Sequence, residues 1–196
     1  MNEEKDSLLN EKDQEKKEGS SFKKSVWEFS KFVIIAVVVV VPIRLWVAQP
    51  FIVSGSSMVP NFENGEYLIV DEFSYHFREP GRGEVIIFRY PQDPSRFFIK
   101  RIIGLPKEKI EIEDSVITIY NDDFPEGMTI NESYLQEGLK TNNDMIMILD
   151  ENEYFVLGDN RPMSSDSRTW GSLEKDMVIG RAWIRLWPLN KISISF

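Results

Sequence analysis

Residues 84–103 read EVIIFRYPQDPSRFFIKRII and contain two short runs rich in β-branched and aromatic side chains, Glu84–Tyr90 and Phe97–Ile103. This composition is typical of β-strands. Turn-forming pairs such as Asn64-Gly65 separate further runs of the same kind on both sides. These further runs are Tyr67–Val70, Lys109–Ile112, Ser115–Tyr120, Met145–Leu149, Tyr154–Leu157, Met177–Trp187 and Ile192–Phe196. The sequence therefore predicts a mainly β domain built from antiparallel strands.

An apolar segment, Phe29–Ala48, precedes this domain. At 1.5 Å per helical residue its length matches a hydrocarbon core of about 30 Å, and Trp46 suits the membrane interface. A cleaved secretory signal peptide is one alternative, but its leading region would be long and acidic, and Trp46 would stand three residues before a cut after Ala48. A buried soluble helix is the other alternative, which the length and the valine run disfavour. We therefore predict a retained transmembrane helix.

Lysines flank the N-terminal side of this segment at Lys23, Lys24 and Lys31, whereas Arg44 lies near its far end. Because positive charge marks the cytoplasmic side, we expect the tail inside the cell and the β domain outside. The tail shows no apolar period and is predicted to be disordered. The predicted parts are a polar cytoplasmic tail at 1–28, a transmembrane anchor at 29–48 and an extracytoplasmic domain at 49–196, with a small insertion near 107–152.

The composition disfavours several classes of function. The net charge is −9 and the pI about 4.8, so we expect no nucleic-acid partner. Cysteine is absent, which removes disulfides, thiolate metal sites and a cysteine nucleophile. His76 is the single histidine, so a zinc site would depend on carboxylates, and we expect neither a metal nor a cofactor. A Ser-His-Asp triad would need His76, whose polar-aromatic surroundings do not favour that role.

Two residues offer a nucleophile and a base without histidine. A base lysine must be neutral, so its pKa of about 10.4 must fall by roughly three units, which requires apolar surroundings. Lys100 follows Phe98 and Ile99, although a lysine that protects an edge strand would look the same. Ser57 follows Gly55, which permits the unusual turn of an exposed nucleophile, although a flexible linker has the same composition. From these residues alone both interpretations stay open.

The polar loop at 158–171 is compatible with a surface turn or with a set of hydroxyls and ion pairs that orient a catalytic group.

This loop is the last of four sequence blocks that occur in order along the chain. These blocks are SGSSMVP at 54–60, RGEVIIFRYP at 82–91, FIKRIIGLP at 98–106 and GDNRPMSSDSRTWG at 158–171. By their order, spacing and position after an apolar segment, the chain resembles type I signal peptidases over residues 29–187. The resemblance implies coiled antiparallel β-sheets that form one compact catalytic core.

The resemblance also implies a Ser/Lys dyad. Ser57 would attack the scissile carbonyl, and Lys100 would take its proton and return it to the leaving amine. Ser164 would hydrogen-bond Lys100 and aim it, while the Ser57 N–H would help to hold the oxyanion. In some members a serine at the position of Gly55 supplies the second oxyanion donor, so that donor is left open here. The other implied site residues are the ion pairs Asp166–Arg168 and Asp159–Arg101, and a substrate groove lined by Val53, Ile87 and Ile99.

The implied substrates are exported pre-proteins with small residues one and three before the cut, bound as an added strand. The implied enzyme is a single-pass protein of the plasma membrane that acts as a monomer, with signal peptides and the lipid bilayer as its partners. Three alternatives stay open. They are a related Ser/Lys peptidase dedicated to one pilus or conjugation protein, a self-cleaving repressor, and a membrane-tethered β-domain that binds peptides without cleaving them. The repressor would need a DNA-binding domain in place of the tail, and the joint presence of Ser57 and Lys100 argues against the binding domain.

Overall fold

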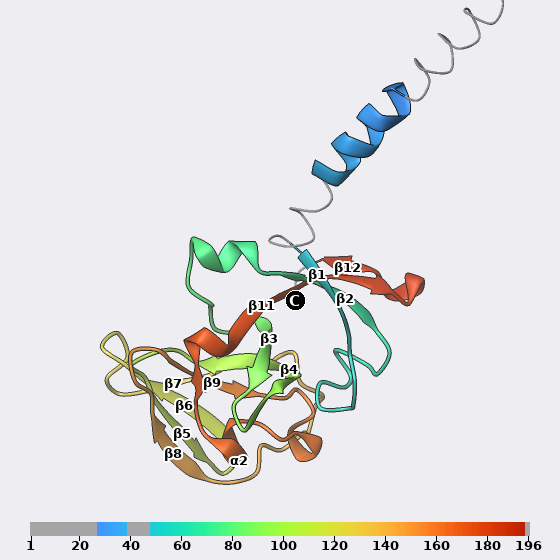
Figure 1. The fold of residues 1–196 in the computed structure, drawn as a ribbon. Coiled ribbons are helices and arrows are strands. Elements are labelled where there is room, and N and C mark those ends of the chain that lie inside the picture. The colour runs from blue at the N-terminus through green and yellow to red at the C-terminus, as the bar shows by residue number, and fades with distance from the viewer. Residues whose placement is uncertain (1–26, 39–47, 195–196) are drawn as a thin grey trace, which may run out of the picture. The chain divides into compact units, whose positions relative to one another are not determined.

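The computed structural model describes residues 27–38 and 48–194, and the chain divides into two units, Met1–Leu45 and Trp46–Phe196. The second unit is mainly β, as Figure 1 shows. Its strands are β1 (Ala48–Ile52), β2 (Tyr67–Asp71), β3 (Val85–Tyr90), β4 (Asp93–Gly104), β5 (Lys109–Glu113), β6 (Val116–Tyr120), β7 (Met128–Thr129), β8 (Met145–Ile148), β9 (Glu153–Leu157), β10 (Leu173–Glu174), β11 (Val178–Trp187) and β12 (Ser193–Ile194). Its helices are short: η1 (Phe73–His76), η2 (Arg161–Met163), α2 (Ser167–Trp170), η3 (Lys175–Met177) and η4 (Leu189–Lys191).

The strands form two antiparallel sheets. The 8-stranded sheet has the order β1-β2-β11-β3-β4-β9-β10, with β12 paired to β11. The 4-stranded sheet has the order β7-β6-β5-β8 and lies within residues 107–152, the stretch predicted as an insertion. Every pairing is antiparallel. The prediction of a mainly β fold with antiparallel strands is therefore confirmed.

The uninterrupted apolar run of β3 has a structural cause. Successive side chains of a strand point to opposite faces, and both faces of β3 are covered. Val85 and Ile87 pack in one buried cluster, whereas Ile86 and Phe88 pack in another. Because β3 lies between β11 and β4, its backbone is also paired on both sides. This buried strand is a rigid support for β4, which carries Lys100.

The smaller sheet buries only one face. Along β5 and β6 the buried positions alternate with more exposed ones, as expected for strands that face solvent on one side. Ile110, Ile112, Ile117 and Ile119 form a third cluster with residues of β9. This sheet therefore packs against the same strand that leads into the polar loop after residue 157.

The strand β1 is absent from the sequence-based predictions. It contains Pro50, which argues against a central strand, and the structure places it at the sheet edge, where it pairs with β2 alone. Ala48, the predicted last residue of the anchor, instead begins this strand and pairs with Asp71. The other strands that the prediction missed, β7 and β10, have two residues each and carry no readable pattern.

The described part of the first unit is helical over residues 27–38, which includes the last two positions of the predicted tail. Its apolar side chains are exposed, among them Phe29 at 69% and Phe32 at 70%. No helix within the described ranges has the length and hydropathy needed to span a bilayer. Residues 39–47 of the predicted anchor and residues 1–26 of the predicted tail lie outside the described residues.

Candidate active site

The loop that carries Ser57 begins where β1 ends. Gly55 has a φ of +95°, a left-handed conformation that favours glycine, and its N–H donates to Asn64 Oδ1 at 3.0 Å. The Ser57 carbonyl accepts from the Asn160 N–H at 2.9 Å, and Asn160 Nδ2 donates to the Ser56 carbonyl at 3.0 Å. The loop is thus closed at its start and fastened at its end to the polar loop after β9, which fixes the position of the serine.

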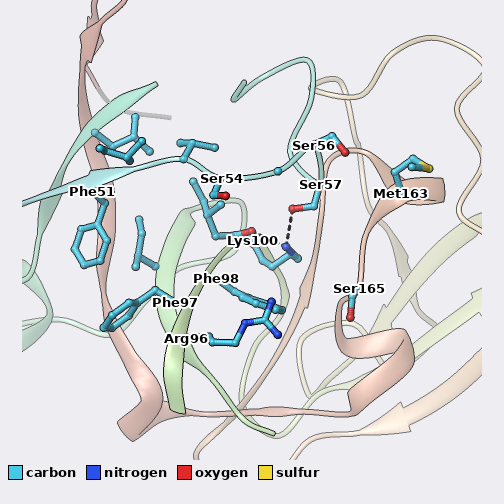
Figure 2. A pocket seen from close by; sticks show the side chains of 16 residues that line it. Phe51, Ser54, Ser56, Ser57, Arg96, Phe97, Phe98, Lys100, Met163 and Ser165 are labelled. Carbon is cyan, nitrogen blue, oxygen red and sulfur yellow. Dashed lines mark hydrogen bonds between the residues drawn. The ribbon is translucent and has the colours of Figure 1, made fainter. Parts of the chain in front are cut away.

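Lys100 lies on β4 with its amine against this serine. Its Nζ donates to Ser57 Oγ at 2.8 Å and to the Ile99 carbonyl at 2.8 Å, and Figure 2 shows the contact with the serine. The lysine is only 3% exposed, and this burial lowers its pKa to about 8, against the raising influence of the Asp166 and Asp159 charges. A substantial fraction is therefore neutral near pH 8, and a neutral amine can accept the serine proton instead of donating to it.

A groove of about 530 Å³ runs past this pair of side chains (Figure 2). On one side it is lined by β1 and the residues after it, and on the other by β4 residues 96–100. Among the described strands, β1 pairs only with β2, and β4 residues 97–100 pair only with β3. Both therefore leave one backbone edge free, to which an extended peptide can hydrogen-bond. Val53, Ile87 and Ile99, the residues predicted for a substrate groove, all line it.

The predicted pair of Asp159 and Arg101 is present and buried. Arg101 donates through Nε to Asp159 Oδ1 at 2.9 Å and through Nη2 to Oδ2 at 2.7 Å. The two side chains are 7% and 1% exposed, in that order. The arginine also donates to the Gly83 carbonyl at 2.8 Å. Because Arg101 adjoins the base lysine and Asp159 adjoins Asn160, this bidentate pair ties β4 to the loop that holds the nucleophile.

The predicted pair of Asp166 and Arg168 is also present. Arg168 donates through Nε and Nη2 to the two carboxylate oxygens of Asp166, each at 2.8 Å. Asp166 is fully buried and further accepts from the Gly158 N–H at 3.1 Å. It also caps α2 by accepting from the Arg168 N–H. The aspartate thus holds both the beginning and the end of the polar loop.

The predicted hydrogen bond between Ser164 and Lys100 is not formed. Ser164 Oγ is buried and has no hydrogen-bond partner among the described residues. Instead the hydroxyl packs against Gly158, where an added Cβ would lie 2.2 Å from it and 2.4 Å from the Ser57 carbonyl oxygen. The lysine uses the Ile99 carbonyl as its second acceptor. Ser164 is therefore beside the nucleophile's backbone, and glycine at 158 is required for this close approach.

His76 lies away from the groove. It is exposed on η1, and its Nδ1 is 3.2 Å from the Glu72 carbonyl. With Glu72, Tyr75 and Lys175 it borders a separate hollow of about 200 Å³.

Among the residues that the structure describes, no cluster of His, Asp and Glu is arranged to hold a metal ion.

Two residues that secure the site have no signal in the sequence. Asn61 donates to Asp159 Oδ2 at 2.8 Å and to the Tyr134 carbonyl at 2.9 Å. The Tyr134 ring lies 4.2 Å from the Arg101 guanidinium carbon. Asn61 belongs to an ordinary polar turn, and Tyr134 lies in the loop between β7 and β8, so only the folded chain reveals their role.

Arg161 is a further residue that the sequence analysis missed. It is 1% exposed and forms an ion pair with Glu132, while its Nε donates to the Gly158 carbonyl at 3.2 Å. Its own carbonyl accepts from Arg168 Nη2 at 2.6 Å. The polar loop is therefore fastened to the segment at 132–141 as well as to the serine loop.

A serine hydroxyl beside a buried lysine with a lowered pKa, in a groove with two free strand edges, is an arrangement that suits a serine peptidase. The chain belongs to the signal peptidase family, peptidase S26, whose family model matches residues 26–187.

Two individual relatives agree with this assignment. A probable signal peptidase I of Synechocystis sp. is 33% identical over 178 residues, which cover 85% of this chain and 87% of the relative. A signal peptidase I of Leptolyngbya laminosa is 34% identical over 168 residues, or 81% of this chain and 78% of the relative. A crystal structure of a signal peptidase I from Enterococcus faecalis matches with a TM-score of 0.45 and 30% identity, covering 53% of this chain and 97% of the other.

Proposed function

We propose that this protein removes N-terminal signal peptides from exported pre-proteins as a serine endopeptidase, with Ser57 as nucleophile and Lys100 as general base. The observation that carries the proposal is the 2.8 Å contact between Ser57 Oγ and a lysine amine that is almost completely buried. Membership of the signal peptidase family supplies the substrate class.

The chemistry follows from the protonation state of the lysine. When neutral, Lys100 Nζ accepts the Ser57 proton as Oγ attacks the scissile carbonyl, and the resulting ammonium gives that proton to the leaving amine. The acyl-enzyme is then hydrolysed by water, which the same amine deprotonates. The Ser57 N–H is the proposed first donor to the oxyanion. Gly55 has no side chain to serve as the second donor.

The groove is proposed to bind the residues before the cut as an extended strand. Its two free backbone edges supply hydrogen-bonding groups on both sides of a peptide, so affinity does not require a particular side chain. The branched aliphatic side chains of Val53, Ile87 and Ile99 fill space beside this path. We infer that they limit the substrate to small residues at the first and third positions before the cut.

The family is membrane-associated, and we propose that residues 29–47, the predicted anchor without Ala48, hold the enzyme there with a cytoplasmic N-terminus. Exposed apolar side chains on the helix at 27–38 support a lipid environment, because such side chains are stabilised when they leave water. Protease added outside spheroplasts should digest the domain after Phe51 and spare the segment before Phe29. The opposite protection pattern would overturn this orientation.

The test of the proposed function uses the detergent-solubilised full chain and a purified pre-protein. Cleavage should yield the mature N-terminus, identified by mass spectrometry, and Ser57→Ala should abolish it. His76→Ala is the matched control, because this exposed histidine lies outside the groove. Equal cleavage by wild type and Ser57→Ala, or loss of cleavage only in His76→Ala, would show that the proposed nucleophile is wrong.

A further inference from the structure

The groove contains a positive charge that the catalytic chemistry does not use. Arg96 lines the groove together with Ser57 and Lys100, on the same face of β4 as the lysine four residues further along. Arg96 is exposed, and within the described residues it makes no hydrogen bond and no ion pair. Hydrogen bonds from Ser95, together with the nearby charge of Arg96, lower the pKa of Asp93, but this carboxylate makes its hydrogen bonds with Ser95 and not with Arg96.

Aromatic rings hold this guanidinium in place. Its central carbon lies 5.3 Å from the ring centroid of Phe98 and 5.8 Å from that of Tyr90, and these two rings are stacked at 4.3 Å. Cation–π contacts of this kind favour a defined position without neutralising the charge. Arg96 therefore presents a positioned cation that keeps its donors free for a ligand.

The cation lies close to the reacting atoms. Lys100 Nζ is 5.2 Å from the Phe98 centroid and the Arg96 guanidinium carbon is 5.3 Å from it, so the two are at most about 10.5 Å apart. An extended peptide rises about 3.3 Å per residue, so this distance corresponds to about three residues. Arg96 is therefore within reach of a substrate side chain near the scissile bond.

We propose that Arg96 is a specificity-determining residue that recognises an acidic side chain of the substrate within about three residues of the cut. This inference rests on the proposed function. Because small residues occupy the first and third positions before the cut, the acidic side chain stands either second before the cut or among the first three residues after it. The chain has a net charge of −9, so a local cation also offsets the general repulsion of an acidic substrate.

Paired peptides that differ only by Glu or Gln at one of these four positions test the proposal with the full-length enzyme. At one position the Glu peptide should have a roughly two- to fivefold higher kcat/KM, through a lower KM, as expected for an exposed ion pair. The preference should shrink at high salt. Arg96→Gln should lose this preference, so that the Glu and Gln peptides are cleaved with equal kcat/KM whatever the effect of the substitution on the rate common to both peptides.

Arg89→Gln is the matched control, because it removes the same charge from the neighbouring strand. Arg89 is exposed and lies over the Phe97 ring at 5.1 Å, but it does not line the groove. This variant should keep the Glu preference. The proposal is overturned if wild type shows no preference at any position, if Arg96→Gln keeps it, or if both variants lose it equally. Failure to cleave any of the peptides would instead overturn the proposed function, and this inference with it.

Discussion

Replacing Asp159 with asparagine tests how far the domain depends on its buried ion pair. The side chain of Asp159 is 1% exposed and that of Arg101 is 7% exposed, so both charges are removed from water. The substitution preserves size and one acceptor oxygen but removes the negative charge, and the guanidinium otherwise keeps only the Gly83 carbonyl and the Tyr134 ring. Breaking a buried pair from one side costs roughly 3–5 kcal/mol. We expect a loss of about 3 kcal/mol, the lower end, because those two contacts remain.

Denaturant unfolding of the detergent-solubilised chain, followed by tryptophan fluorescence, measures this loss as a lower midpoint with an unchanged slope. Glu151→Gln is the control, since its ion pair with Lys107 is largely exposed and its loss should not move the midpoint. Replacing both Arg101 and Asp159 with leucine should recover part of the stability, because neither of these two charges is then left buried without its partner. A loss below about 1 kcal/mol for Asp159→Asn would refute the reasoning, because a charge deprived of its partner inside the fold costs more.

Three further predictions concern the groove and its loops. Gly158→Ala should abolish peptide cleavage, because its Cβ would lie 2.4 Å from the backbone oxygen of the nucleophile. Gly81→Ala should keep wild-type activity, because the nearest atoms to its Cβ would be 3.8 Å away. Phe98→Ser should admit water to Lys100 and raise its pKa from about 8, which would move the acidic limb of kcat/KM to higher pH. If the limb stays in place, desolvation is not the cause of the lowered lysine pKa. Ser164→Ala should lower kcat less than tenfold and should not move the acidic limb, because the Ser164 hydroxyl makes no hydrogen bond to Lys100. A total loss of cleavage would contradict the observed packing.

Most of the fold could be predicted because most strands are rich in β-branched and aromatic residues. The runs at 84–90 and 97–103 became β3 and part of β4, although β4 starts four residues earlier, at Asp93. The residues at the beginning of β4 were not predicted as strand because Pro94 and Ser95 disfavour one. β1 was missed for a related reason, since Pro50 is tolerated only where the strand has a free edge. Whether a strand lies at the edge of a sheet depends on how all the strands pair, so it cannot be predicted from the residues of that strand alone.

The site was predictable where residues act in pairs that the family motifs contain. The two ion pairs, Asp159–Arg101 and Asp166–Arg168, have the expected geometry. The hydroxyl of Ser164 does not make the expected hydrogen bond to Lys100. The partner of a hydroxyl depends on differences in distance of a few tenths of an ångström, which cannot be predicted from the sequence. The backbone bonds from Asn160, which fix the serine loop, also come from two segments that only the fold brings together.

The pH dependence of kcat/KM for pre-protein cleavage tests the central claim most directly, because it reports the base of the free enzyme. Burial lowers the pKa of Lys100 to about 8, and below that value the protonated amine cannot accept the Ser57 proton. The rate constant should therefore rise about tenfold per pH unit up to about pH 8 and then level off, and Lys100→Met should be inactive across the range. An acidic limb near pH 6.5, the ordinary pKa of histidine, that disappears in His76→Ala would contradict the Ser/Lys mechanism.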